Sequence, residues 1–268
     1  MAEKREMAEK AVEAGRRAGN SLLESIGWHS VFVVALVQGD MAAAREAQRC
    51  LAEIAKEMKS VTQDHFPLVT RATLMLAKGC LGESEKTVFE AFAHGQATGF
   101  ANAQIAFGGQ LSLLRWYQGR FAEMESVWRG IVQQSPDVET FQAALALALL
   151  DAGKTDEAER VFDSLAEAGF ANIPEDGNWM AAMIVLADVC ARLDKREGAA
   201  DLYEVMSRYP DRNATAGNAV SYGPIARGLG MLATVLERWD DAERHFLYSI
   251  GMSERGGMRP ALAQTRLN

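Results

Sequence analysis

The sequence has few cysteines and no paired cysteine motif. Cys50, Cys80 and Cys190 are far apart, and no CxxC occurs. An odd number of separated cysteines argues against both a disulfide framework and a local zinc site. We therefore expect three buried thiols in a reducing compartment, and hence a cytoplasmic protein.

Local catalytic and metal-binding motifs are also missing. No HExxH or GxSxG occurs, and the two closest histidines, His65 and His94, are 29 residues apart. The run Gly153-Lys154-Thr155 is similar to the end of a phosphate-binding loop, but Ala148 stands where that loop needs its first glycine. The sequence thus predicts no catalytic residue, no metal site and no cofactor.

Long apolar runs and an excess of basic charge are absent as well. Apolar runs such as 31–37 and 143–150 are far shorter than the ~20 residues of a membrane span. The first 17 residues are charged and lack the apolar core of a signal peptide. A net charge of -8 argues against a phosphate-binding surface. We expect no membrane and no direct nucleic acid among the partners.

One stretch, 149–166, has the pattern of a tetratricopeptide helical hairpin. Gly153 stands at the turn, Ala158 where two helices cross closely, and Phe162 and Leu165 on the buried face of the second helix. The same frame recurs along the chain. The predicted turns fall near 39, 79, 119, 153, 194 and 237.

The frame predicts an all-α fold: a right-handed α-α superhelix, or tetratricopeptide-like solenoid, of about six hairpins plus a lone helix at each end. We expect residues 1–268 to form a single solenoid without a convincing strand. The stretches 168–177 and 208–218 are rich in proline, glycine and asparagine and are expected to be irregular loops. Both end helices lack a hairpin partner and are expected to fray.

The first helices of such hairpins line a concave groove, whose positions lie three, six and ten residues before each turn. These positions are mostly apolar, with an aromatic at Trp116 and polar groups at His29, Thr73, Asp188 and Arg227. They are our candidate ligand-binding residues, with Asp188 and Arg227 orienting a peptide, a partner helix or an apolar small molecule. The alternative is a tight superhelix in which these apolar residues pack on one another.

Three runs, IPEDGNWMAAM, GPIARGLGMLA and RPALAQTR, carry a family resemblance. From residue 95 onward the chain resembles the C-terminal tetratricopeptide-like region of large bacterial signalling ATPases, which are coupled to a nucleotidyl cyclase or a DNA-binding domain. The resemblance implies a sensor or assembly region without catalytic parts. It also places Asn178, Trp179 and Tyr222 at the starts of first helices, as further ligand-binding candidates near one rim of the groove.

Two classes of function follow. The first is a non-catalytic binding or sensor scaffold that recognises a protein, a peptide or an apolar small molecule in its groove and acts in bacterial signalling or transcriptional control. The second is an enzyme that uses the apolar groove as a pocket, with His29 or Asp188 as acid or base. An oligomer is compatible with either class.

Overall fold

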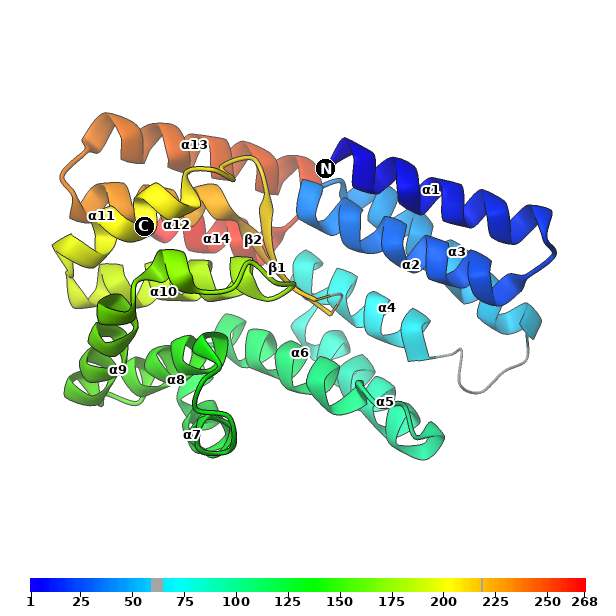
Figure 1. The fold of residues 1–268 in the computed structure, drawn as a ribbon, viewed down its shortest axis with the longest axis horizontal. Coiled ribbons are helices and arrows are strands. Elements are labelled where there is room, and N and C mark those ends of the chain that lie inside the picture. Colours follow the sequence, from blue (N-terminus) through cyan, green and yellow to red (C-terminus); the bar gives the residue numbers. More distant parts are fainter. Residues whose placement is uncertain (59–64, 218) are drawn as a thin grey trace.

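The computed structural model describes residues 1–58, 65–217 and 219–268, and this part of the chain is almost entirely helical (Figure 1). It contains fourteen α-helices, two short 3-10 helices and two short strands. In chain order they are α1 (Ala2–Arg17), α2 (Ser21–Gln38), α3 (Met41–Met58), α4 (His65–Lys78), α5 (Leu81–Thr98), α6 (Ala103–Tyr117), η2 (Phe121–Met124), α7 (Glu125–Gln134), α8 (Glu139–Asp151), α9 (Thr155–Ala168), η3 (Phe170–Asn172), α10 (Trp179–Leu193), α11 (Arg196–Met206), β1 (Asn213–Ala216), β2 (Val220–Pro224), α12 (Ile225–Val235), α13 (Trp239–Gly256) and α14 (Arg259–Leu267). The predicted all-α class is confirmed.

All six predicted turn residues lie in the left-handed region of the backbone. Their φ angles are 70° at Gly39, 84° at Gly79, 68° at Gly119, 74° at Gly153, 52° at Asp194 and 59° at Glu237. Glycine adopts such angles without a Cβ penalty, whereas the other residues do so at some cost. Within the described chain, Asp194 and Glu237 are the two non-glycine residues with positive φ. The turn positions read from the sequence are therefore confirmed.

The predicted crossing residues lie between packed helices. Ala44, Ala158 and Ala199 have no exposed surface, and Ala242 is 5% exposed. On the partner side, a Cβ added at Gly230 of α12 would lie 2.5 Å from the ring of Phe246 on α13. At these crossings small residues let the two helices of a pair approach closely, whereas the third pair has the larger Met124 at the equivalent position. The largest group of buried apolar side chains spans α8 to α12.

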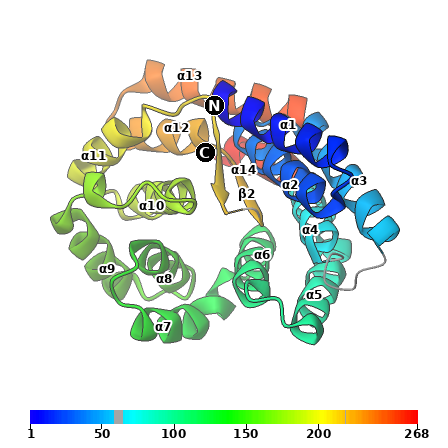
Figure 2. The ribbon, with the colours of Figure 1, turned by 45° about the vertical axis from the view of Figure 1, so that its right-hand side comes forward.

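The helices follow one another around a central region, as Figure 2 shows. Helices α8, α10 and α12 are successive neighbours, each the first helix of its pair. At the end of this path, α13 and α14 return to the beginning of the chain. Met252 and Met258 pack in one apolar cluster with Phe32 and Leu36 of α2.

The end helices are packed, so the expectation that they fray is wrong. Helix α1 lies so close to α2 that a Cβ at Gly15 or Gly27 would clash with the backbone of the facing helix. Helix α14 contacts α4 and buries Ala261 and Thr265. Each end helix therefore has a tertiary partner that the hairpin frame does not contain.

The segment expected to be a loop at 208–218 contributes one strand of a β-hairpin; its last residue, Asn218, lies outside the described residues. Strands β1 and β2 pair antiparallel, with Asn213 opposite Pro224 and Ala216 opposite Val220, and a bulge follows Ala214. The two strands are only four and five residues long and lie in a stretch rich in glycine, asparagine and proline, which is why the sequence predicted a loop here. The surrounding helices bury them on both faces.

Two of the three thiols are buried. Cys50 and Cys190 are buried, whereas Cys80, at the start of α5, is half-buried. Burial raises the pKa of the Cys190 thiol to about 12, which keeps it protonated. The expectation of buried thiols thus holds for two of the three.

Helix α2 is long and apolar enough to cross a membrane by length and composition, and it is the one such helix in the described residues. In the structure it lies between α1 and α3 and buries Phe32, Ala35 and Leu36 completely or almost so. A buried core helix has the same composition as a membrane span.

Candidate functional site

Three of the predicted groove residues come together in the centre of the molecule. Arg227 of α12 donates from Nη1 to Oδ2 of Asp188 on α10 (3.2 Å). Its guanidinium carbon lies 5.6 Å from the ring centroid of Trp116 on α6. The Trp116 ring packs in turn on Tyr222 of β2, with centroids 5.7 Å apart. Three helices and the hairpin therefore meet at one cation-aromatic cluster, which we call the Arg227 cluster (Trp116, Asp188, Tyr222 and Arg227).

Arg227 is an unusual residue for an interior, because only 2% of it is exposed. Besides Asp188, its Nη1 reaches the Met231 sulfur at 3.2 Å, but its Nε and Nη2 have no hydrogen-bond partner. Asp188 is 14% exposed, and its other oxygen lies 3.9 Å from Arg192. A buried guanidinium depends on its counter-charge, so this ion pair is part of the packed interior.

Tyrosine side chains surround the same cluster. Burial raises the pKa of Tyr222 to about 12, and burial also raises the pKa of the neighbouring Tyr117 well above its ordinary value. The Tyr117 hydroxyl lies 3.5 Å from the Ser221 carbonyl on the hairpin. Both phenols therefore stay neutral at physiological pH; Tyr117 donates to the hairpin, and Tyr222 packs on Trp116.

The fourth predicted groove residue, Thr73 of α4, binds the hairpin. Its Oγ1 donates to the carbonyl of Ala219 at 2.6 Å. Gln110 of α6 donates from Nε2 to the same carbonyl (3.1 Å) and to the Val69 carbonyl (2.8 Å). All these groups are buried, and the sequence had not singled out Gln110. Two helices thus hold one backbone carbonyl of the hairpin.

At the other end of the hairpin, Asn213 donates from Nδ2 to the Leu36 carbonyl of α2 (2.9 Å). Between the two ends, a Cβ added at Gly109 would lie 2.9 Å from the Val220 side chain. Leu36, Thr73, Gly109 and Trp116 all occupy predicted groove positions. These four residues face the hairpin, which lies in the central region of the molecule (Figure 2).

His29, the remaining groove candidate, lies away from the Arg227 cluster. Its ring packs on Phe66 of α4 with centroids 4.6 Å apart. Burial lowers the pKa of His29 to about 4, so the imidazole is neutral at physiological pH. His29 is in this structure a packing residue between α2 and α4.

The two rim candidates at the start of α10, Asn178 and Trp179, differ from each other. Asn178 is exposed, and its backbone N–H donates to Oδ1 of Asp176 at 2.8 Å. Trp179 is 3% exposed and packs edge-on against Tyr209 with centroids 5.3 Å apart. Tyr222, the third rim candidate, belongs to β2 and joins the Arg227 cluster instead. The structure does not gather these three residues at one rim.

The arrangement offers little for catalysis. The Asp188 carboxylate is engaged by two arginines, and His29 packs in a different part of the chain. Among the described residues, no group of three or more histidine, cysteine, aspartate or glutamate side chains is placed to hold a metal ion. The polar groups on the inner face bind the Ala219 carbonyl or form the Arg227–Asp188 ion pair. They are not arranged as a nucleophile with a neighbouring base.

A second concave feature, which sequence reasoning missed, lies between α3, α4 and the α13–α14 turn. Four basic side chains line it: Arg45, Arg71, Lys78 and Arg259. The sequence does contain a signal for these four basic residues, namely the lack of acidic neighbours on the same helix face. None of the four has an acidic residue three or four positions away, whereas Arg49, for example, has Glu46 and Glu53.

Neither protein-family models nor curated proteins give a match to this chain. Two features of the structure bear on its function: the inner face that the hairpin contacts, and the basic cleft between α3, α4 and the α13–α14 turn.

Proposed function

We propose that this chain is a non-catalytic binding scaffold of tetratricopeptide-like type, a superhelix of helical hairpins whose inner face recognises an extended polypeptide segment. In support, the six turns share one backbone conformation, and buried small residues occupy five of the six crossing positions: Ala44, Ser84, Ala158, Ala199 and Ala242. Helices α8, α10 and α12 follow one another as the first helices of successive pairs, as stacked repeats would.

The observation that carries this proposal is the way the hairpin is held. Gln110 and Thr73 both donate to the backbone carbonyl of Ala219, while Trp116 packs on the Tyr222 ring. Backbone hydrogen bonds combined with a side-chain pocket are the means by which proteins recognise extended peptides. The inner face therefore already has the chemistry of a polypeptide-binding surface.

The resemblance to bacterial signalling ATPases gives this surface a context. On that reading the scaffold is a cytoplasmic sensor or assembly region, and an extended segment of a partner protein competes with the hairpin for the inner face. An enzyme that uses His29 or Asp188 as acid or base has no comparable support, because His29 packs on Phe66 and Asp188 is paired with Arg227.

The proposal is tested by removing the hairpin and supplying it as a peptide. The Ile225 N–H donates to the Arg212 carbonyl at 2.8 Å, so the two ends of the hairpin are adjacent. Residues 213–224 can therefore be replaced by a short Gly-Ser linker without moving α11 or α12. A fluorescein-labelled peptide of residues 212–225 is then titrated into this linker variant, with fluorescence anisotropy as the readout.

We expect saturable binding to the linker variant and none to the parent chain, whose inner face is occupied. Gln110→Leu in the linker variant should weaken binding at least ~10-fold, because the Ala219 carbonyl loses a buried donor. Gln134→Leu, an exposed glutamine at the end of α7, is the matched control and should have no effect.

Two results would contradict the proposal. One is a folded linker variant that does not bind the peptide, or binds it equally well with Gln110→Leu. The other is a linker variant that loses its helical circular dichroism, which would make the hairpin part of the core and not a bound segment.

A further inference from the structure

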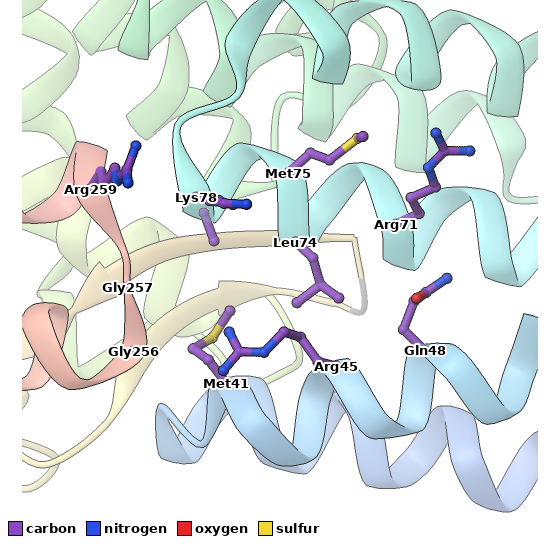
Figure 3. Close-up of a pocket in the computed structure, with 11 residues that line it drawn as sticks. Met41, Arg45, Gln48, Arg71, Leu74, Met75, Lys78, Gly256, Gly257 and Arg259 are labelled. Carbon is purple, nitrogen blue, oxygen red and sulfur yellow. The ribbon is translucent and has the colours of Figure 1, made fainter.

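The cleft between α3, α4 and the α13–α14 turn has a volume of about 400 Å³. Its walls are regular. Met41, Arg45 and Gln48 lie on one face of α3, and Arg71, Leu74, Met75 and Lys78 lie on one face of α4. Figure 3 shows these side chains, with Gly256, Gly257 and Arg259 closing one end. A cleft of this size holds a small organic molecule.

The lining of this cleft combines one sign of charge with an apolar surface. Arg45 projects from α3, Arg71 and Lys78 from α4, and Arg259 from the start of α14, while no aspartate or glutamate lines the cleft (Figure 3). The Arg259 Cβ lies 3.5 Å from where a Cβ of Gly79 would be, which places Arg259 beside the end of α4 that carries Lys78. Met41, Leu74, Met75 and Ala77 supply the apolar part.

These four cations are also unneutralised. In the described chain none of them forms an ion pair, whereas several other arginines are paired even where they are exposed, such as Arg120 with Glu123 at 2.7 Å. The protein as a whole carries a net charge of -8. A local group of four free positive charges on a negatively charged protein makes this cleft the place to which an anion is drawn.

We infer that this cleft is a binding site for a small organic phosphate, with a di- or triphosphate group among the four cations and its organic part on the methionines and Leu74. Guanidinium groups bind phosphate oxygens in bidentate fashion, and a phosphate chain carries enough charge to balance several cations at once. A monocarboxylate would leave most of that charge uncompensated. This site is separate from the inner face, so the inference does not depend on the proposed function.

The position of the cleft gives such a ligand a structural effect. One wall belongs to the N-terminal helices α3 and α4, and the end of the cleft belongs to the α13–α14 turn, which packs on them through Met41 against Gly256. A phosphate bound to Arg45, Arg71 and Arg259 together would connect the first and last parts of the chain. Binding should therefore stabilise the packing of the C-terminal helices on the N-terminal ones.

The test uses the full chain and three probes: adenosine diphosphate, inorganic pyrophosphate and adenosine. Isothermal titration at low salt should show binding of adenosine diphosphate, weaker binding of pyrophosphate, and none of adenosine. Binding should weaken as salt is raised, since exposed charges carry it. At a hundredfold excess over Kd, adenosine diphosphate should raise the melting temperature by ~5 °C.

Variants locate the site. Arg71→Gln and Arg259→Gln should each weaken adenosine diphosphate binding ~10-fold or more, as expected for loss of a charged hydrogen bond. The matched control is Arg160→Gln on α9, an exposed arginine without an ion pair, which should bind like the parent. All the changed side chains are exposed, so the variants should fold normally.

The inference is overturned if neither adenosine diphosphate nor pyrophosphate binds at millimolar concentration. It is also overturned if Arg71→Gln and Arg259→Gln bind like the control. Tighter binding of citrate or of a single-stranded oligonucleotide than of adenosine diphosphate would likewise refute a site built for a small organic phosphate.

Discussion

Removing Asp188 should destabilise this protein far more than removing its partner Arg227. Arg227 is 2% exposed, and two of its nitrogens lack a partner, so Asp188 is its single counter-charge within 4 Å among the described residues. Asp188→Leu therefore leaves a buried guanidinium uncompensated. Arg227→Met removes the buried charge and leaves an apolar chain beside Trp116 and Met231, while Asp188 keeps Arg192 nearby.

The magnitudes follow from burial. Removing one partner of a buried ion pair costs about 3–5 kcal/mol, and since Asp188 itself is partly exposed, we expect about 3 kcal/mol for Asp188→Leu. An apolar replacement of the buried charge is close to neutral, so Arg227→Met should change the free energy of unfolding by about 1 kcal/mol or less. Combining Arg227→Met with Asp188→Leu should recover most of the loss, about 2 kcal/mol.

Urea unfolding followed by circular dichroism at pH 7 measures all three variants, provided that the m-value stays constant. The reasoning would be refuted by an Arg227→Met variant as unstable as Asp188→Leu, or by a double variant no better than Asp188→Leu alone. Either result would mean that the arginine contributes packing or hydrogen bonds beyond its pairing with Asp188.

Three further predictions concern the repeat frame and pH. Ala158→Leu and Ala242→Leu should each overpack a helix crossing and cost ~1–3 kcal/mol in urea unfolding, and unchanged midpoints for both would show that these positions are free. Glu237→Gly should stabilise by ~0.5–1 kcal/mol, because it relieves a left-handed backbone at φ 59°, whereas Glu243→Gly within α13 should destabilise by ~1 kcal/mol; a loss at position 237 would contradict the strain argument. Because burial depresses the pKa of His29 to about 4, the unfolded state binds its proton first as pH falls; stability should therefore decline from about pH 6.5 towards pH 4 by up to ~1.4 kcal/mol per pH unit. His29→Phe should remove that part of the pH dependence, and equal slopes in parent and variant would exclude His29 as its source.

The hairpin also limits the size of one side chain on α14, that of Ala261. Ala261 is 2% exposed, and its Cβ lies 2.6 Å from where a Cβ of Gly223 would be. The hairpin therefore occupies the space that an aromatic ring would need.

The sequence alone determined where the helices turn and which faces they bury. A left-handed turn residue, a small crossing residue and apolar residues at helical spacing are local requirements, and each can be read in a window of about twenty residues. This is why the six turns, the crossing alanines and even the inner-face positions Thr73, Trp116 and Arg227 could be predicted.

Only the tertiary structure decided what meets that inner face and how the ends of the chain are packed. Strands β1 and β2 are short and lie among glycine, asparagine and proline residues, so their own strand signal is weak. They form where α2, α4, α6 and α10 pack against them, and α2, α4 and α6 supply hydrogen-bond partners. The packing of α13 and α14 on α2 to α4 joins residues more than 200 positions apart, such as Met41 and Gly256. The basic cleft arises at that junction, where Arg259 joins Arg45 and Arg71. Contacts of this kind depend on the three-dimensional path of the whole chain, and no local pattern encodes them.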